Sequence, residues 1–327
     1  MARAVPTDGI FPGADQVQPF QWDSAPLRGR LVRLGPALET ILHRHAYPEP
    51  VAWLLAEMTA LTTVLAATLK FDGIFTLQAK GEGAVRMLVA DLVQNGSAPR
   101  ALRAYAQMDP DAVAALALPA GQCPPLRQLT GGGYLAFTVD QGEHAERYQG
   151  IVGLDGDSLT ACVQHYFRQS EQLPTGLVVA ARPDPTGWRA AALMMQQMPD
   201  PADPARLPTA EGAPGDGRED DWRRAMVLMA TCTAEELLDS TLSPHALLYR
   251  LFHQEGVRVF DPWPVEHRCR CSRARVATTL RALSDDAVES LKENGQITVS
   301  CQFCNQRYVF DSLPPEPDNA GSDPSPG

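Results

Sequence analysis

Four cysteines near the end of the 327-residue chain have the residue type and the spacing to do chemistry. They form two tight pairs, Cys269 with Cys271 and Cys301 with Cys304. Two such pairs can close a tetrahedral shell of four thiolates around one metal ion, and zinc is the usual occupant. The spacing therefore predicts one zinc ion on these four sulfurs. Taken alone, the spacing favours a purely structural zinc site.

The flanking segments indicate how the two pairs are brought together. Strands are expected at 296–300 and 306–310, which places the second pair at the turn of a hairpin. The first pair precedes a helical pattern beginning at Ser272, and Ser284 can cap a second helix that ends at Gly295. A module of this size buries little apolar surface. Bound zinc is therefore expected to supply much of its folding free energy, on the order of 10 kcal/mol.

The surroundings of the first pair suggest a redox role as the alternative. Positive charge favours thiolate over thiol and keeps the sulfur nucleophilic. Oxidation of one sulfur to the sulfenic acid invites its partner to condense into a disulfide, and the metal site then collapses. A disulfide across one intervening residue is tight and should be easily reduced again. The nearby cations are four arginines: Arg268, Arg270, Arg273 and Arg275.

Composition excludes several classes of function. A net charge of -11 argues against a general binder of nucleic acid or anionic membrane. We find no secretory signal pattern, and four of the seven cysteines read as metal ligands, so a cytoplasmic location is expected. No paired carboxylates and no Ser/His/Asp arrangement stand out, so no enzyme activity is predicted.

The remaining cysteines and three histidines are interpreted without a chemical role. Cys123, Cys162 and Cys232 each lack a neighbouring cysteine and are expected to be bystander thiols. His267 lies near the first pair, but four sulfurs already complete a zinc shell. The remaining two, His43 and His45, are expected to be surface or packing residues.

Upstream, residues 1–199 are predicted to form an α+β core with a mixed sheet. The apolar run 51–69 contains Glu57 and several threonines, so it is interpreted as a buried core helix. Strands and helices occur without βα alternation, and residues 1–19 are expected to be a loose terminus. Further helices are expected at 37–45 and 159–170. The expected strands are 27–34, 74–78, 85–93, 134–139, 148–154, 176–181 and 188–195.

A linker is predicted at 200–265, flexible at first and then helical. Residues 200–221 are dense in Pro, Asp, Gly and Ala and predict an exposed link. Three short helices follow, the second capped by Thr233 and the third opened by Ser243. Their apolar stripe either packs on the core or forms a metastable layer that uncovers apolar surface when displaced. The zinc-binding redox-switch module is placed at 266–312, and 313–327 is expected to be a disordered tail.

The chain resembles the 33 kDa chaperonin family, which are bacterial redox-regulated heat-shock chaperones. The likeness extends from about residue 27 to residue 310 and includes the specific cysteine pattern. It is carried by the segments 267–275 (HRCRCSRAR), 301–304 (CQFC), 147–154 (RYQGIVGL), 170–174 (SEQLP), 69–73 (LKFDG) and 259–262 (VFDP).

The resemblance implies a specific mechanism. Family members are ATP-independent holdases, inactive when reduced with zinc on four cysteine thiolates. Oxidation would form disulfides within each pair, Cys269 with Cys271 and Cys301 with Cys304, and release the zinc. The module and the linker would then unfold, so that exposed apolar surface captures unfolded client proteins. The active form would be a homodimer.

Two other classes of function are weighed against this one. A thiol-disulfide oxidoreductase requires a Cys-x-x-Cys at the start of a helix, whereas Cys301 and Cys304 are predicted in a hairpin. A zinc-ribbon nucleic-acid binder requires a basic face. Residues 266–311 hold seven Lys/Arg against six Asp/Glu, a balance of only +1.

Overall fold

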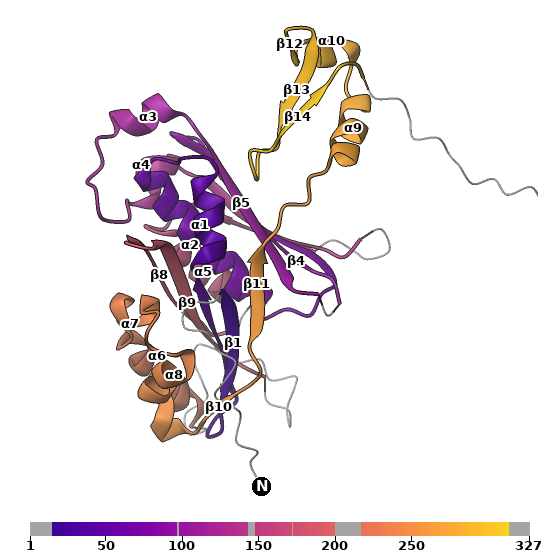
Figure 1. Cartoon of the computed structure of the whole chain (residues 1–327). Coiled ribbons are helices and arrows are strands. Elements are labelled where there is room, and N and C mark those ends of the chain that lie inside the picture. Colours follow the sequence, from indigo (N-terminus) through magenta and orange to yellow (C-terminus); the bar gives the residue numbers. More distant parts are fainter. Residues whose placement is uncertain (1–14, 97, 143–147, 172, 200–216, 314–327) are drawn as a thin grey trace, which may run out of the picture. The chain divides into compact units, whose positions relative to one another are not determined.

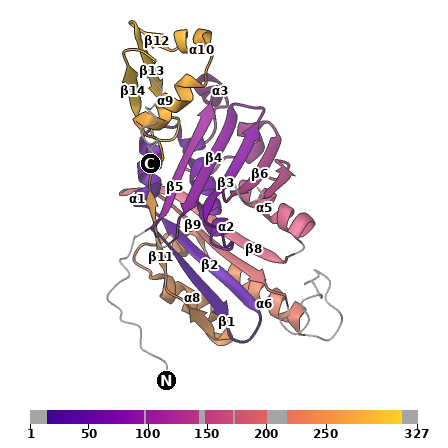
Figure 2. The same ribbon diagram turned by 90° about the vertical axis from the view of Figure 1, so that its right-hand side faces the viewer.

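The computed structural model describes residues 15–96, 98–142, 148–171, 173–199 and 217–313. The chain divides into two compact units, Met1–Arg268 and Cys269–Gly327, which we name the core unit and the cysteine module. Residues 200–216 of the link predicted at 200–221, 1–14 of the terminus predicted at 1–19 and 314–327 of the tail predicted at 313–327 lie outside the described residues. The link prediction was wrong at its end, because a helix already begins at Arg218. Figures 1 and 2 show the elements of both units.

One mixed sheet organises the core unit (Figures 1 and 2). Neighbouring strands are antiparallel except β5 and β11, which are parallel, and β10 (Val257–Val259) pairs with β1 beside the main path. The α+β prediction is confirmed. The strand order is β7 (Tyr148–Gly153), β6 (Gly133–Asp140), β3 (Gly73–Gly81), β4 (Val85–Gln94), β5 (Arg100–Met108), β11 (Trp263–His267), β1 (Gln16–Trp22), β2 (Leu27–Leu34), β9 (Gly187–Gln197) and β8 (Thr175–Asp184).

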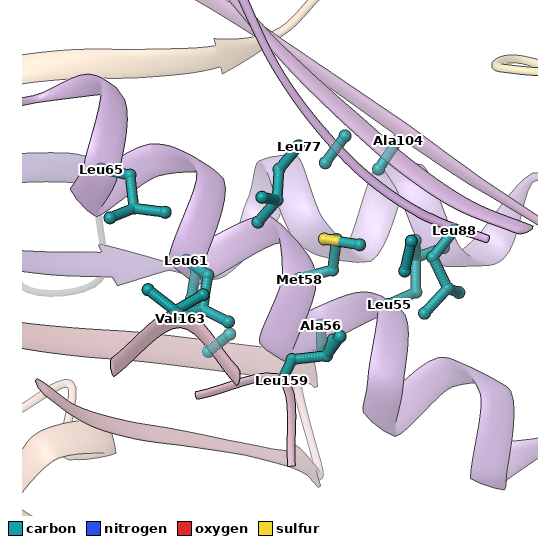
Figure 3. Packing of buried hydrophobic residues seen from close by; sticks show 14 of the residues in the cluster. Leu55, Ala56, Met58, Leu61, Leu65, Leu77, Leu88, Ala104, Leu159 and Val163 are labelled. Carbon is teal, nitrogen blue, oxygen red and sulfur yellow. The ribbon is translucent and has the colours of Figure 1, made fainter. Parts of the chain in front are cut away.

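The first face of this sheet is covered by helix α2 (Glu49–Ala66), with α1 (Pro36–His43) and α5 (Leu159–Tyr166) beside it. Every residue from Val51 to Ala66 is buried. Figure 3 shows α2 side chains such as Met58 and Leu61 among buried residues of β3, β4, β5 and α5. The α2 threonines donate to backbone carbonyls four residues earlier, for example Thr62 Oγ1 to Met58 O at 2.8 Å. The prediction of a buried core helix is confirmed.

The second face is covered by the predicted linker helices, α6 (Arg218–Ala230), α7 (Ala234–Leu238) and α8 (Pro244–Phe252). Phe252 of α8 stacks on Phe20 of β1 with ring centroids 5.6 Å apart. Strand β9 is buried on both sides, because Leu193 packs under the linker helices and Met194 packs in the core of the first face. The apolar stripe of the linker therefore packs on the sheet. The predicted Thr233 capping box and the Ser243 cap are both present.

Several predicted boundaries were wrong, and some strands were not predicted at all. Strand β1 begins at Gln16, inside the terminus that was expected to be loose up to residue 19. Strands β5, β10 and β11 were not predicted. Residues of β1 that look polar are buried, since the Gln18 side chain is fully enclosed and donates to Phe260 O at 2.5 Å. The predicted helices also end early, α2 at Ala66, and α5 at Tyr166 before the π-helical turn η1 (Phe167–Glu171). Short helical elements complete the unit: α3 (Pro110–Ala115), α4 (Leu126–Thr130) and η2 (His253–Glu255).

Among the described residues, no helix combines the length and the apolarity needed to cross a membrane.

The cysteine module contains helices α9 (Arg273–Arg281) and α10 (Asp285–Glu289) and a small sheet. The strands follow the order β12 (Lys292–Glu293), β13 (Gln296–Ser300), β14 (Arg307–Phe310). Gly295 does not end the second helix as predicted. Helix α10 stops at Glu289, and Asn294 and Gly295, both at positive φ, turn β12 into β13. The buried apolar residues of this module are Ala277, Leu280, Val288, Ile297 and Phe310.

Candidate metal centre

Local structure places each cysteine pair at the end of an element. Cys301 follows β13, and Cys304 lies in the turn before β14, as the hairpin prediction required. The turn is closed by Asn305 N, which donates to Cys301 O at 2.8 Å while Asn305 adopts φ 56°. The first pair precedes α9, whose N-cap Ser272 accepts a hydrogen bond from Arg275 N at 3.2 Å.

The four sulfurs converge on one point. Their Sγ atoms all lie within 4.8 Å of one another. Cys269 is 3.6 Å from Cys301, and Cys271 is 3.3 Å from Cys304. In a tetrahedral zinc site with bonds of about 2.3 Å, the sulfurs are about 3.8 Å apart, so these residues fit the ion. Within the described part of the chain, no other group of three or more His, Cys, Asp or Glu side chains is arranged to hold a metal.

The thiols have different acidities. Burial raises the pKa of Cys269, but the backbone N–H of Cys271 and the neighbouring sulfurs outweigh burial and lower it to about 7. Burial raises the pKa values of Cys301 and Cys304. Tyr308 donates from Oη to Cys271 Sγ at 3.2 Å, and this hydrogen bond raises the pKa of Tyr308 to about 12. The cluster thus combines one sulfur of lowered pKa, Cys269, with two of raised pKa, Cys301 and Cys304.

Two of the four arginines near the first pair make structural contacts. Arg273 donates to Val309 O at 2.8 Å, and its guanidinium lies 4.1 Å from the centre of the Phe310 ring. Arg275 donates to Arg270 O at 2.7 Å. These contacts fix α9 against β14 and fold the loop of the first pair. The low pKa of Cys269 comes first from a backbone N–H and the other sulfurs.

The other candidate residues lie outside the cluster of four sulfurs. His267 lies on β11 of the core unit, paired with Leu102. Among the other cysteines, Cys162 is buried in the core of the first face and Cys232 under the linker helices, whereas Cys123 is exposed. His43 ends α1, and the ring of His45 stacks on that of Tyr47. Tyr308 was not predicted as a neighbour of the cluster. The only sign of it in the sequence is that it lies in the strand that follows the second cysteine pair.

Comparison with known proteins identifies the family. The family model described as Hsp33 protein matches residues 15–311. The chain belongs to the Hsp33 family. It is 38% identical to the 33 kDa chaperonin of Caulobacter vibrioides over 316 residues, covering 95% of this chain and 99% of the relative.

Other members of the Hsp33 family are as similar. Identity to the 33 kDa chaperonin of Pseudomonas aeruginosa is 42% over 301 residues, covering 91% of this chain and 92% of the relative. The crystal structure of the 33 kDa chaperonin of Thermotoga maritima shares the fold, with a TM-score of 0.70 at 19% identity. It is matched over 91% of this chain and 94% of that one. The mixed sheet and the cysteine module thus belong to a chaperonin fold.

Proposed function

We propose that this protein is an ATP-independent holdase chaperone of the bacterial cytoplasm, switched by the redox state of Cys269, Cys271, Cys301 and Cys304. The observation that carries the proposal is the convergence of these four sulfurs in a module with a small apolar core. Membership of a chaperonin family supports the choice of a chaperone over the structural zinc ribbon and the oxidoreductase. Zinc, when bound, would hold the sulfurs as thiolates and stabilise the fold of the module.

The switch is a two-electron oxidation of each cysteine pair. Two thiols form one disulfide and give up two electrons and two protons, which reduce one peroxide to two molecules of water. Cys269 is suited to react before Cys301 and Cys304, because its pKa is lowered to about 7 whereas their pKa values are raised. Disulfide sulfurs no longer offer thiolate ligands, so the oxidised module would lose its metal and its fold. The proposed pairs are Cys269 with Cys271 and Cys301 with Cys304.

Activation would continue through the linker. In this proposal residues 1–199 form the client-binding and dimerising core, 200–265 the linker and 266–312 the switch. The linker helices cover an apolar layer of the sheet that includes Phe20 and Leu31. Displacing them would present this layer to unfolded client proteins, and the active form would be a homodimer. The net charge of -11 supports protein clients over nucleic acid.

The test measures zinc and chaperone activity together. Zinc release is followed with a chromogenic chelator, and aggregation of a thermally unfolded client by light scattering. Both are recorded before and after peroxide at mildly elevated temperature, or hypochlorous acid, and again after reductant. We expect release and protection to appear together and to reverse together. Zinc that stays bound, or leaves with no gain in protection, contradicts the proposal.

Matched variants and peptide mapping sharpen this test. Cys304→Ser should abolish the coupled change in zinc release and client protection after peroxide. Cys123→Ser, at an exposed thiol outside the cluster, should behave as the wild type. Mass spectrometry of the oxidised protein should find both disulfides within the pairs. The short sulfur contacts of the structure join Cys269 to Cys301 and Cys271 to Cys304, so disulfides across the pairs are the contradicting result.

A further inference from the structure

Strand β11 joins two halves of the core sheet. Its neighbours are β5, to which it is parallel, and β1, to which it is antiparallel. The order β7-β6-β3-β4-β5 lies on one side of β11, and β1-β2-β9-β8 on the other (Figure 2). Without β11, the edges of β5 and β1 would face each other across two inter-strand spacings of about 4.8 Å each. We name this space the β11 slot.

The pairing that holds β11 is short. Three of its residues pair with β5 and two with β1. One of the two opposite β1 is Pro264, which has no N–H to donate to a ladder. Pairing with β5 is parallel, which is slightly less stable per residue than antiparallel pairing. Two more backbone hydrogen bonds hold the segment: Val265 N, in the middle of the strand, donates to Asp15 O at 3.0 Å, and Arg268 N, just beyond it, donates to Leu102 O at 3.1 Å.

The chain order couples β11 to the cysteines. The strand ends at His267, and Cys269 is the second residue after it. When the cysteine module unfolds, β11 loses the ordered chain beyond its C-terminal end. A strand with so few pairs then frays more readily than β8 and β9, which pair along ten residues.

The walls of the slot do not depend on β11 alone. Helix α2 packs on β3, β4 and β5 of one half of the sheet and on β2, β9 and β8 of the other. Its side chains are buried along its whole length from Val51. Both edges are therefore held in place by the core of the first face after β11 has left.

We propose that the β11 slot binds an extended segment of an unfolded client in the oxidised protein. This inference rests on the proposed holdase function and names a site for it. The segment would replace β11 and pair its backbone with β5 and β1, which requires no particular sequence. A client strand fits because the slot already accommodates an extended chain of five residues.

Two side chains of β11 indicate which segments fit well. Val265 is 4% exposed and belongs to the core of the first face. Trp263, two residues earlier and therefore on the same side of the strand, lies under the Arg100 guanidinium at 3.6 Å from the ring centre. The slot should therefore favour an aromatic residue followed, two positions later, by an aliphatic one.

A peptide-binding experiment tests the slot directly. A labelled peptide with the sequence of residues 261–268 is added to the oxidised full-length protein, and fluorescence anisotropy reports binding. We expect binding to the oxidised and not to the reduced protein, and competition by an unfolded client. The same peptide carrying Val265→Asp should bind about tenfold more weakly, because a charge would enter an apolar position. Equal binding of the two peptides would overturn the proposal.

Hydrogen exchange locates the site and separates it from the proposed function. Amides of Gln16–Val17 and Arg100–Leu102 should exchange faster after oxidation and become protected again when client or peptide binds. A protein that suppresses aggregation without this renewed protection binds its clients elsewhere, and the slot is wrong while the function stands. If the peptide binds and these amides regain protection, but aggregation is not suppressed, the slot is supported and the proposed holdase function is wrong. Protection that returns in the homodimer before any client or peptide is added shows strand exchange between two copies, which also overturns the client site.

Discussion

The core unit and the cysteine module obtain their stability from different sources. The core unit has two apolar layers, one on each face of a sheet whose β8 and β9 pair along ten residues. In the cysteine module, five buried apolar residues are described, and β13 and β14 pair along four residues. Apolar burial is extensive in the first unit, whereas in our proposal the second depends on the metal that its sulfurs hold. One chemical event at the sulfurs would then unfold the module and leave the core folded.

The largest expected effect unfolds the cysteine module and leaves the core unit folded. Cys304→Ser removes a proposed zinc ligand, whose residue is 6% exposed, and replaces it with serine, a poor zinc ligand. We expect loss of metal-binding free energy on the order of 10 kcal/mol and an unfolded module. Limited trypsin digestion should then cleave at Arg281 and Lys292, while the core unit resists. The same variant should retain the thermal transition of the core.

Chelator treatment of the wild type should reproduce that cleavage pattern. The Cys123→Ser variant without chelator should not show it. If the Cys304→Ser module resists trypsin as the wild type does, its five apolar residues are sufficient and the contrast between the two units is wrong.

The converse experiment creates a cavity in the core. Leu61 on α2 is fully buried (Figure 3), so Leu61→Ala should cost about 2–5 kcal/mol of unfolding free energy. Urea denaturation followed by tryptophan fluorescence measures this loss, and the zinc content should not change. Leu69→Ala, at a side chain 43% exposed just beyond α2, is the matched control and should have little effect. A loss of zinc in Leu61→Ala would mean that the two units do not unfold independently.

A smaller effect is expected within the core unit, at the attachment of the linker helices. Arg33 of β2 donates to the carbonyls of Leu237 and Glu236, both at 3.0 Å, and to that of Leu242. It thereby satisfies carbonyl groups at the end of α7, a helix of five residues. Arg33→Met should weaken this attachment by about 1–3 kcal/mol, because buried carbonyls lose their donor.

The measurable result is faster hydrogen exchange in α7 and activation at a lower dose of oxidant. Arg28→Met, at an exposed side chain of the same strand, removes the same charge without removing the Arg33 contacts and serves as the control. Equal oxidant thresholds in both variants would exclude Arg33 from holding the linker in its inactive position.

The successes and failures of sequence analysis follow the range of the interactions involved. The caps at Ser284, Thr233 and Ser243 were predictable because each accepts a hydrogen bond from a backbone N–H three residues later. The sulfur cluster was predictable from its spacing. Strand β1 was not, because Gln18 looks exposed in sequence and is buried by Phe260 and His245, more than 220 residues away. Cap signals lie in neighbouring residues, whereas strand pairing depends on distant ones.

The last effect concerns pH and belongs to the core alone. Burial raises the pKa of Glu57 on α2 above 4.5, against hydrogen bonds from Thr160 N at 2.9 Å and Thr160 Oγ1 at 2.6 Å. The folded chain therefore holds this proton more tightly than the unfolded chain. Its contribution to stability is fully present below the unfolded pKa and is lost as pH rises through the folded one.

Glu57→Gln should remove this dependence, since an amide keeps an acceptor for Thr160 and never ionises. The unfolding free energy of the wild type relative to the variant should fall with rising pH by at most about 1.4 kcal/mol per pH unit. Urea titrations of both proteins from about pH 5 to about pH 8 measure this difference, and effects of the module cancel because both proteins share it. Glu49→Gln, on the same helix, controls for the removal of a carboxylate. If the difference does not change with pH, Glu57 is ionised in the folded core, and the core tolerates a buried charge that our account of its apolar layer excludes.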